Sequence, residues 1–274
     1  MSLLRLASDD DGAAMGGMTA APSDDPGSLL EIIAVAPPGD LQSLPPPDPL
    51  VAHFNPMLRS FRFTIVQQPI RARMCGSSDK DWRPLSPPVV LKLELFDLHG
   101  NQVIDNAFMQ HLIVHTTLWN DSKEEELTVV ELPHNTSSKR ISAAAKSRKR
   151  GVTQFGNRSS EMGLEIENNL LGDYTASSSI VEDEHGVRGC FFVFSNLSIR
   201  LEGRYRLRFM LVKLPSMRDI YESMIPKPLA TIHSDAFDVY SIKTFPGMIE
   251  STPLSRALAQ QGLKIPIRNT QDTN

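Results

Sequence analysis

The most restrictive feature of this chain is an alternation of apolar and polar residues over 201–214. Successive side chains of a β-strand point to opposite faces of its sheet, so this period of two predicts a strand buried on one face. The same period recurs at 61–65 and 89–95, and a turn at Asp97–Asn101 closes the second of these strands. Five further runs complete a set of eight expected strands: Phe108–Trp119, Leu127–Leu132, Tyr174–Val181, Gly189–Phe194 and Ala236–Ile242. Many short strands with little helix predict an all-β sandwich.

The start of the 201–214 stretch, Leu-Glu-Gly-Arg-Tyr, is typical of a corner in an immunoglobulin-type sandwich. In such folds a tyrosine just past the corner bonds back to upstream backbone, and a disulfide cysteine follows two residues later. Gly203 and Tyr205 fit this structural corner, whereas Leu207 stands at the position of the cysteine. Cys75 and Cys190 are too few for a disulfide framework or a four-cysteine zinc site. We therefore expect sheets held by packing alone, in a reducing compartment.

Two short helices are expected besides the strands. Ser216 followed by Asp219 resembles a capping box, which starts a helix. Thr252 and Pro253 begin a second helix, and Gly262 ends it. Packing of these helices on the sandwich is the favoured interpretation, and binding of a partner is the alternative.

Residues 1–58 differ in composition from the rest of the 274-residue chain. They are rich in Pro, Gly, Ser and Asp, so we predict a disordered N-terminal segment followed by one folded domain at 59–270. We interpret the apolar island Leu29–Val35 as a chance cluster, the alternative being a docking segment that orders on a partner. No membrane span or secretion signal is recognisable, so we expect an intracellular protein without a membrane partner.

The formal net charge of −4 is unevenly distributed. Residues 1–50 hold eight acidic residues and one arginine, so residues 51–274 hold 24 acidic and 27 basic residues. This small positive excess is compatible with a nucleic-acid surface but does not by itself identify one.

Basic residues gather in the connection Gln67–Pro88, which follows the first predicted strand. Arg71 and Arg73 are two positions apart, so on extended backbone they point the same way and offer two planar guanidinium groups to base edges or phosphates. Lys80 and Arg83 lie further along the same connection. A solvated charged loop is the alternative interpretation.

Three long motifs resemble the velvet domain of fungal regulators. They are QQPIRARMCGSSDKDWRPLSPPVVLKLELFD, GCFFVFSNLSIRLEGRYRLRF and SDAFDVYSIKTFPGMIESTPLSRALAQQGLKIPIRN, and they span about Phe61–Asn269. The resemblance implies a Rel-like sandwich, DNA binding, homo- or heterodimers among velvet proteins, and regulators that couple development and sporulation to secondary metabolism. It also implies that the loop after Pro69 recognises DNA through four residues: Arg71, Arg73, Lys80 and Arg83. Trp82 departs from the family pattern, in which another basic residue often precedes the arginine.

A basic cluster lies within a predicted flexible insertion at 134–168. Its residues are Lys139, Arg140, Lys146, Arg148, Lys149 and Arg150. Their spacing is typical of a bipartite nuclear import signal, which predicts a nuclear protein with a cytoplasmic pool. A solubilising loop and nonspecific phosphate contact are the alternatives. In having an insertion here, the chain resembles the B-type branch of the velvet complex proteins.

Enzyme chemistry is not expected. His111 and His115 lack the glutamate that follows the first histidine in the metalloprotease pattern, and no third ligand is evident. No nucleophile elbow or phosphate-binding glycine loop is present, so we expect no catalytic residue, metal or cofactor. Cys75 is interpreted as a small structural residue rather than a redox-sensitive thiol.

Two classes of function therefore remain. The first is a sequence-specific transcriptional regulator of fungal development, sporulation and secondary metabolism that binds double-stranded DNA as a homo- or heterodimer. Its partners would be another velvet protein and a methyltransferase-type regulator of secondary metabolism. The second is an interaction subunit of a velvet complex that leaves DNA contact to its partner.

Overall fold

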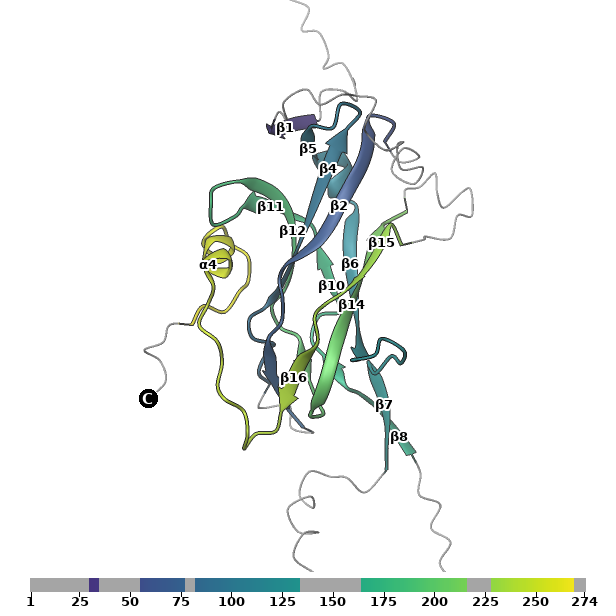
Figure 1. Cartoon of the computed structure of the whole chain (residues 1–274), viewed down its shortest axis with the longest axis vertical. Coiled ribbons are helices and arrows are strands. Elements are labelled where there is room, and N and C mark those ends of the chain that lie inside the picture. The colour runs from purple at the N-terminus through teal and green to yellow at the C-terminus, as the bar shows by residue number, and fades with distance from the viewer. Residues whose placement is uncertain (1–29, 35–54, 77–81, 134–163, 216–227, 269–274) are drawn as a thin grey trace, which may run out of the picture.

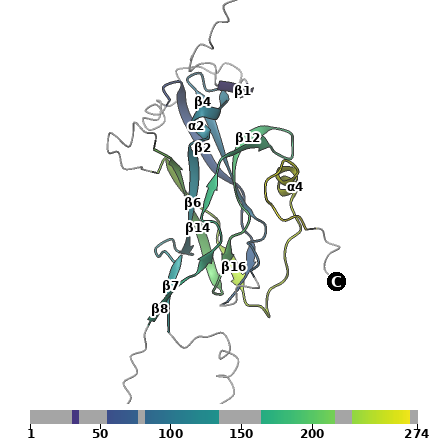
Figure 2. The ribbon, with the colours of Figure 1, turned by 180° about the vertical axis from the view of Figure 1, so that it is seen from behind.

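The computed structural model describes residues 30–34, 55–76, 82–133, 164–215 and 228–268. Within these residues the chain forms two sheets that face each other in a sandwich, with two short helices (Figures 1 and 2). The predicted all-β sandwich is thereby confirmed. No helix among the described residues is both long and apolar enough to cross a membrane.

The first sheet is built around its central strand β4. Its order is β1 (Leu30–Ala34), β5 (Gln102–Asp105), β4 (Val89–Asp97), β12 (Arg188–Phe194) and β11 (Ser179–Glu182), and β2 (Leu58–Gln67) also pairs with β4. All of these pairings are antiparallel.

The second sheet is built around the long strand β14. Its order is β10 (Thr175–Ser177), β6 (Leu112–Asn120), β14 (Gly203–Lys213), β16 (Phe237–Tyr240) and β3 (Arg71–Arg73), and β15 (Ala230–His233) also pairs with β14. The edge strand β3 runs parallel to β16, whereas the other pairings are antiparallel. Two small sheets complete the described strands: β9 (Leu170–Leu171) with β13 (Ser198–Ile199), and β7 (Val129–Pro133) with β8 (Leu164–Asn168).

The main core lies between the two sheets, where strands of both sheets turn apolar residues inward. Phe194 of β12 and Phe209 of β14 meet across the layers with ring centroids 5.4 Å apart. Both rings are buried, as are Leu91 of β4 and Leu118 of β6. Burial of apolar surface is the main term that stabilises a domain without disulfides, and neither Cys75 nor Cys190 forms a disulfide bond.

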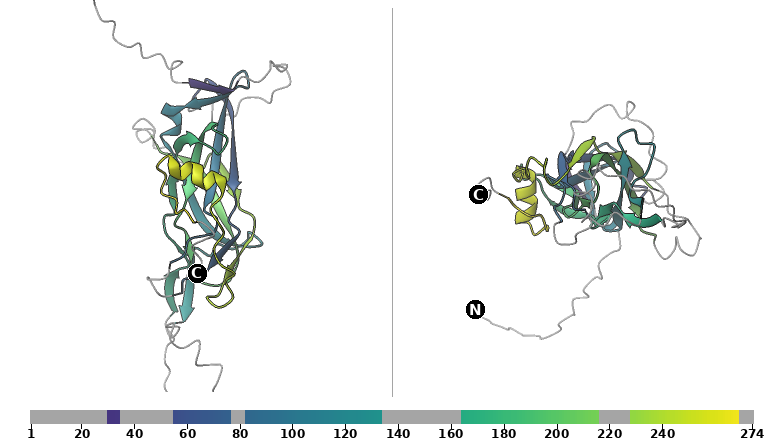
Figure 3. Two further views of the ribbon diagram at one scale, coloured as in Figure 1. Left: turned by 90° about the vertical axis from the view of Figure 1, so that its left-hand side faces the viewer. Right: turned by 90° about the horizontal axis from the view of Figure 1, so that it is seen from below.

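Helix α4 (Pro253–Gln260) covers the outer face of the first sheet (Figure 3). The Thr252 hydroxyl accepts a hydrogen bond from the Ser255 backbone at 3.1 Å and so caps the predicted helix start. Leu254 and Leu258 then pack against Val90 and Phe191 of the sheet. The predicted helix after Ser216 lies outside the described residues.

Two expectations for irregular segments need correction. Residues 30–34, interpreted as a chance apolar cluster in a disordered segment, form strand β1 against β5. Strand β8, at 164–168, falls in the predicted flexible insertion and pairs with β7. In both cases the backbone groups find partners on a distant strand, which local composition does not reveal. For the rest of 1–54 and of 134–163, disorder stays a prediction.

The strand predicted from Phe108 begins later than expected. The Asp105 carboxylate accepts a hydrogen bond from the Phe108 backbone at 3.0 Å and caps α2 (Asn106–Met109). Strand β6 therefore starts only at Leu112. The predicted turn after β4 is present, because the Asp97 side chain accepts hydrogen bonds from the backbones of His99 and Asn101, at 2.8 Å each.

Candidate nucleic-acid interface

The connection between β2 and β4 contains the predicted DNA-binding residues and is anchored at Ser86. Arg71 and Ser86 exchange two backbone hydrogen bonds, at 3.1 and 2.9 Å, and form an isolated antiparallel bridge. Residues directly opposite each other in such a bridge point their side chains to the same face. The Arg71 side chain is thereby fixed on the same face as the Ser86 hydroxyl.

The two arginines of β3 differ in exposure. Arg71 is partly exposed, and its guanidinium group makes no hydrogen bond, ion pair or ring contact with any described residue. Arg73 is only 7% exposed, although the strand spacing puts it on the same face as Arg71. Of the pair, Arg71 is the one that presents its guanidinium group to a ligand in this conformation.

The second half of the connection places Trp82 and Arg83 on the surface. The Trp82 side chain is 45% exposed, and Arg83 is exposed beside it. The Arg83 backbone carbonyl accepts a hydrogen bond from the Ser198 hydroxyl at 3.0 Å, which fixes the chain at this point. Lys80 lies outside the described residues.

Sequence reasoning missed one basic residue of this region, Arg268. It lies in the segment after α4, where it is partly buried. Burial lowers the pKa of its guanidinium group, and the positive charge of Arg83 lowers it further. In the sequence, Arg268 is visible only as a basic residue of the third velvet motif. Nothing in that motif indicates that Arg268 lies near Arg83, about 180 positions earlier.

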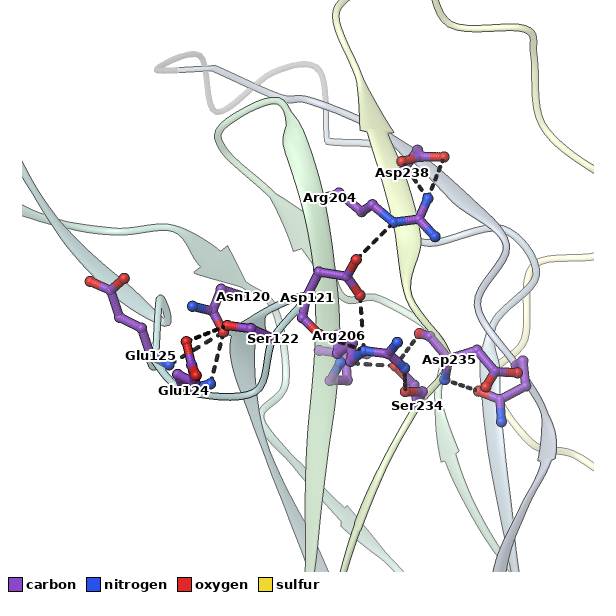
Figure 4. Close-up of polar contacts among 12 residues, drawn as sticks. Asn120, Asp121, Ser122, Glu124, Glu125, Arg204, Arg206, Ser234, Asp235 and Asp238 are labelled. Atoms are coloured by element: carbon purple, nitrogen blue, oxygen red, sulfur yellow. Dashed lines mark hydrogen bonds and ion pairs between the residues drawn. The ribbon is translucent and has the colours of Figure 1, made fainter.

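Other arginines of the second sheet are engaged in an ion-pair network (Figure 4). The Asp121 carboxylate accepts from the Nε atoms of Arg204 and Arg206, at 3.1 Å each. Arg204 also donates to Asp238 at 3.1 Å, and Arg206 donates to the Ser234 carbonyl at 2.9 Å. These arginines serve the fold, and their groups are not free for a ligand as that of Arg71 is.

The corner before β14 is built from Gly203 and Tyr205. Gly203 has a φ of +155°, and a Cβ atom at this position would lie 3.0 Å from the Tyr205 ring. The Tyr205 hydroxyl donates to the Glu202 carbonyl at 3.4 Å, and the ring is 6% exposed. Burial raises the pKa of Tyr205, while the neighbouring Asn169 side chain acts in the opposite direction.

The remaining candidates contribute no site among the residues that the structure describes. No group of three His, Cys, Asp or Glu side chains that could hold a metal ion occurs there. Cys75 is buried and its thiol lies 3.4 Å from the Ile199 carbonyl, and burial raises the pKa of Cys190 to about 12. All six residues of the predicted import signal lie outside the described ranges.

Comparison with known proteins identifies the family of the chain. The model of the velvet factor family matches residues 61–272, so the chain belongs to the velvet family. It is 32% identical to the sexual development regulator umv3 of Mycosarcoma maydis over 77% of this chain and 46% of that protein. It is 28% identical to the velvet complex subunit umv2 of the same fungus over 81% of this chain and 64% of that protein.

A third relative matches over more of its own length. The velvet complex subunit RYP3 of Ajellomyces capsulatus is 31% identical over 77% of this chain and 79% of that protein. The chain thus spans less than two thirds of the two Mycosarcoma relatives, but more of the Ajellomyces protein.

Proposed function

We propose that this chain is a sequence-specific regulator that binds double-stranded DNA through the β2–β4 connection. The observation that carries the proposal is Arg71, whose guanidinium group has no partner among the described residues and is held on a fixed strand edge. A planar guanidinium group of this kind donates two hydrogen bonds to a guanine edge. Arg83, in the same connection, supplies a cation for the phosphate backbone.

We further propose that the chain works as a homo- or heterodimer with another velvet protein in the control of fungal development. This rests on relatives whose names are sexual development regulator and velvet complex subunit. Regulation of sporulation and secondary metabolism, and contact with a methyltransferase-type regulator, are the finer expectations that the velvet resemblance adds. The domain limits 59–270 remain a proposal as well.

The second candidate function is an interaction subunit that leaves DNA contact to its partner. The burial of Arg73 favours it, because only one of the two arginines of β3, Arg71, is even partly exposed. The two candidates differ in a single respect, which is whether this chain alone contributes groups to base edges.

Selection of bound sequences from random DNA duplexes tests both candidates. The protein is used alone and then together with each velvet protein of the same fungus. A regulator enriches one motif, and Arg71→Ala in this chain weakens that enrichment. An interaction subunit enriches nothing alone, and the motif enriched with a partner does not depend on Arg71.

We propose a nuclear location on the basis of the cluster Lys139–Arg150. Replacement of Arg148, Lys149 and Arg150 by alanine should shift a fluorescent fusion towards the cytoplasm, because import receptors bind exposed basic segments. The same replacement should leave the melting temperature unchanged. An unaltered nuclear signal in cells that lack the other velvet proteins would reject the import assignment.

A further inference from the structure

We infer that Arg268, in the segment that follows α4, is a phosphate contact of the same interface and acts beside Arg83. The inference rests on the proposed DNA binding and adds a second chain segment to it. The ligand group is a phosphate of the duplex backbone, not a base edge. The C-terminal segment would thus be part of the binding surface as well as a cover for the first sheet.

A chain of hydrogen bonds ties Arg268 to the basic connection. The Ser86 hydroxyl accepts from the Ile249 backbone at 2.8 Å, which docks the segment between β16 and α4 on the connection. Two residues on, Ser251 donates its backbone N–H to the Arg268 carbonyl at 3.2 Å. In return, the Arg268 backbone donates to the Ser251 hydroxyl at 2.8 Å. Ser86 therefore pairs with Arg71 directly and also holds, through Ile249, the segment that pairs with Arg268.

The path of the chain explains how the hydrogen bond between Ile249 and Ser86 joins two segments that are remote in sequence. After β16 the chain runs towards the end of the sandwich from which β7 and β8 project, and then turns back to α4 (Figure 1). Helix α4 is held on the first sheet by the buried side chains of Leu254 and Leu258. Ile265 is buried in the same cluster, so the chain returns to Ser251 at a fixed place.

The positive charge of the arginine side chains in this region favours binding of an anion. Arg71 and Arg268 are the two arginines among the described residues whose guanidinium groups have no hydrogen bond, ion pair or ring contact. Arg268 is also partly buried and lies close enough to Arg83 for the two positive charges to repel each other. A phosphate placed between two guanidinium groups would remove this repulsion and accept hydrogen bonds from both.

Arg256 provides a matched comparison within the same segment. It lies on α4, is partly exposed, and donates to the Glu250 carboxylate at 2.7 Å and to the Ser251 carbonyl at 3.2 Å. Its charge is therefore satisfied within the protein. A general effect of positive charge on DNA affinity would appear on loss of either arginine, whereas a phosphate contact would appear only for Arg268.

The test is a salt titration of binding to the selected duplex with the full chain, in the oligomeric state that binds. Arg268→Gln should lower the slope of log affinity against log salt by about one unit and keep the base preference, because one phosphate contact is lost. Arg268→Lys should keep the wild-type slope, and Arg256→Gln should leave slope and affinity unchanged. Inorganic phosphate, added at constant ionic strength, should not compete with the duplex for the protein. A single free anion lacks the contacts that the rest of the duplex makes.

The possible results separate this inference from the proposed function. A wild-type slope for Arg268→Gln, together with weakened binding by Arg71→Ala, overturns the inference alone. No binding of the wild type to any duplex, with or without a partner, overturns both. If Arg268→Gln does not fold, the Arg268 Nε–H signal of wild-type protein, followed by NMR, decides: it should shift on addition of duplex while that of Arg256 stays. An unshifted Arg268 signal overturns the inference.

Discussion

Tyr205 lies buried under the turn that Gly203 makes, with its hydroxyl group 3.4 Å from the Glu202 carbonyl. Removal of this hydroxyl in Tyr205→Phe breaks the hydrogen bond to the Glu202 carbonyl, so we expect the free energy of unfolding to fall by about 1 kcal/mol. Urea denaturation measures the change. Tyr240→Phe is the control, because the Tyr240 hydroxyl has no hydrogen bond to any described residue. Equal stability of both variants and wild type would contradict the role of the corner.

His233 makes stability depend on pH. It lies edge-on to the Trp119 ring, with centroids 6.2 Å apart, and its pKa is lowered from 6.5 by burial, then by the charges of Lys123, Arg208 and Arg206. Well above pH 6.5, the ordinary histidine pKa, the side chain is neutral in both the folded and the unfolded chain. Below that value the unfolded chain takes up the proton first, so the free energy of unfolding falls until the lowered native pKa is reached.

Comparison of wild type with His233→Gln tests this dependence. The free energy of unfolding of each protein is measured at about pH 7.5 and about pH 5.5, on either side of the ordinary histidine pKa, and the difference between the two pH values is compared. Wild type should lose more stability than the variant on acidification, because glutamine takes up no proton. An equal loss in the two proteins would show that the His233 pKa is not lowered by folding.

The exposure and the neighbours of individual side chains could not be predicted from the sequence. The strand spacing correctly puts Arg71 and Arg73 on one face, but their different exposure depends on what covers each of them. Arg268 comes near Arg83 only because the chain folds back after α4. Both facts arise from long-range packing, which periodicity within one segment does not encode.

Helix α4 is the element that holds the C-terminal segment on the sandwich. Leu258 is fully buried against the first sheet. Leu258→Ala removes buried methyl groups and leaves a cavity, so we expect a loss of about 2 to 4 kcal/mol in the free energy of unfolding. Leu214→Ala, the same change at a side chain that is 44% exposed, should cost far less. If the two substitutions cost the same, α4 does not pack as described.

At the scale of elements, strands with a clear period of two were predictable. The strands β2, β4 and β14 lie where alternation placed them, because each has one face in the core. Strand β12 lies where a continuous apolar run predicted it, and it is buried on both faces. The short strands β1, β3 and β5 were not predicted. Strands of three to five residues are too short to show a period, and they exist because a neighbouring strand supplies their hydrogen bonds.

At the scale of the whole molecule, the sandwich places one face of its edge strand β3 beside the returning C-terminal segment. The composition of the chain indicates only a small positive excess outside residues 1–50. The fold pairs most other arginines with acids or carbonyl groups, as in the Asp121 network. A basic surface is therefore defined here by which arginines are left unpaired and not by how many there are.

The role of the β2–β4 connection in DNA binding is measured by the affinity of Arg71→Ala for the DNA motif selected by the wild type. We expect a loss of about 1 to 3 kcal/mol in binding free energy and a relaxed preference at one base position. Arg83→Ala should instead weaken binding to all sequences alike and lower the salt slope by about one unit. Unchanged affinity, base preference and salt slope in both folded, dimeric variants would contradict DNA recognition by this connection and favour the interaction subunit.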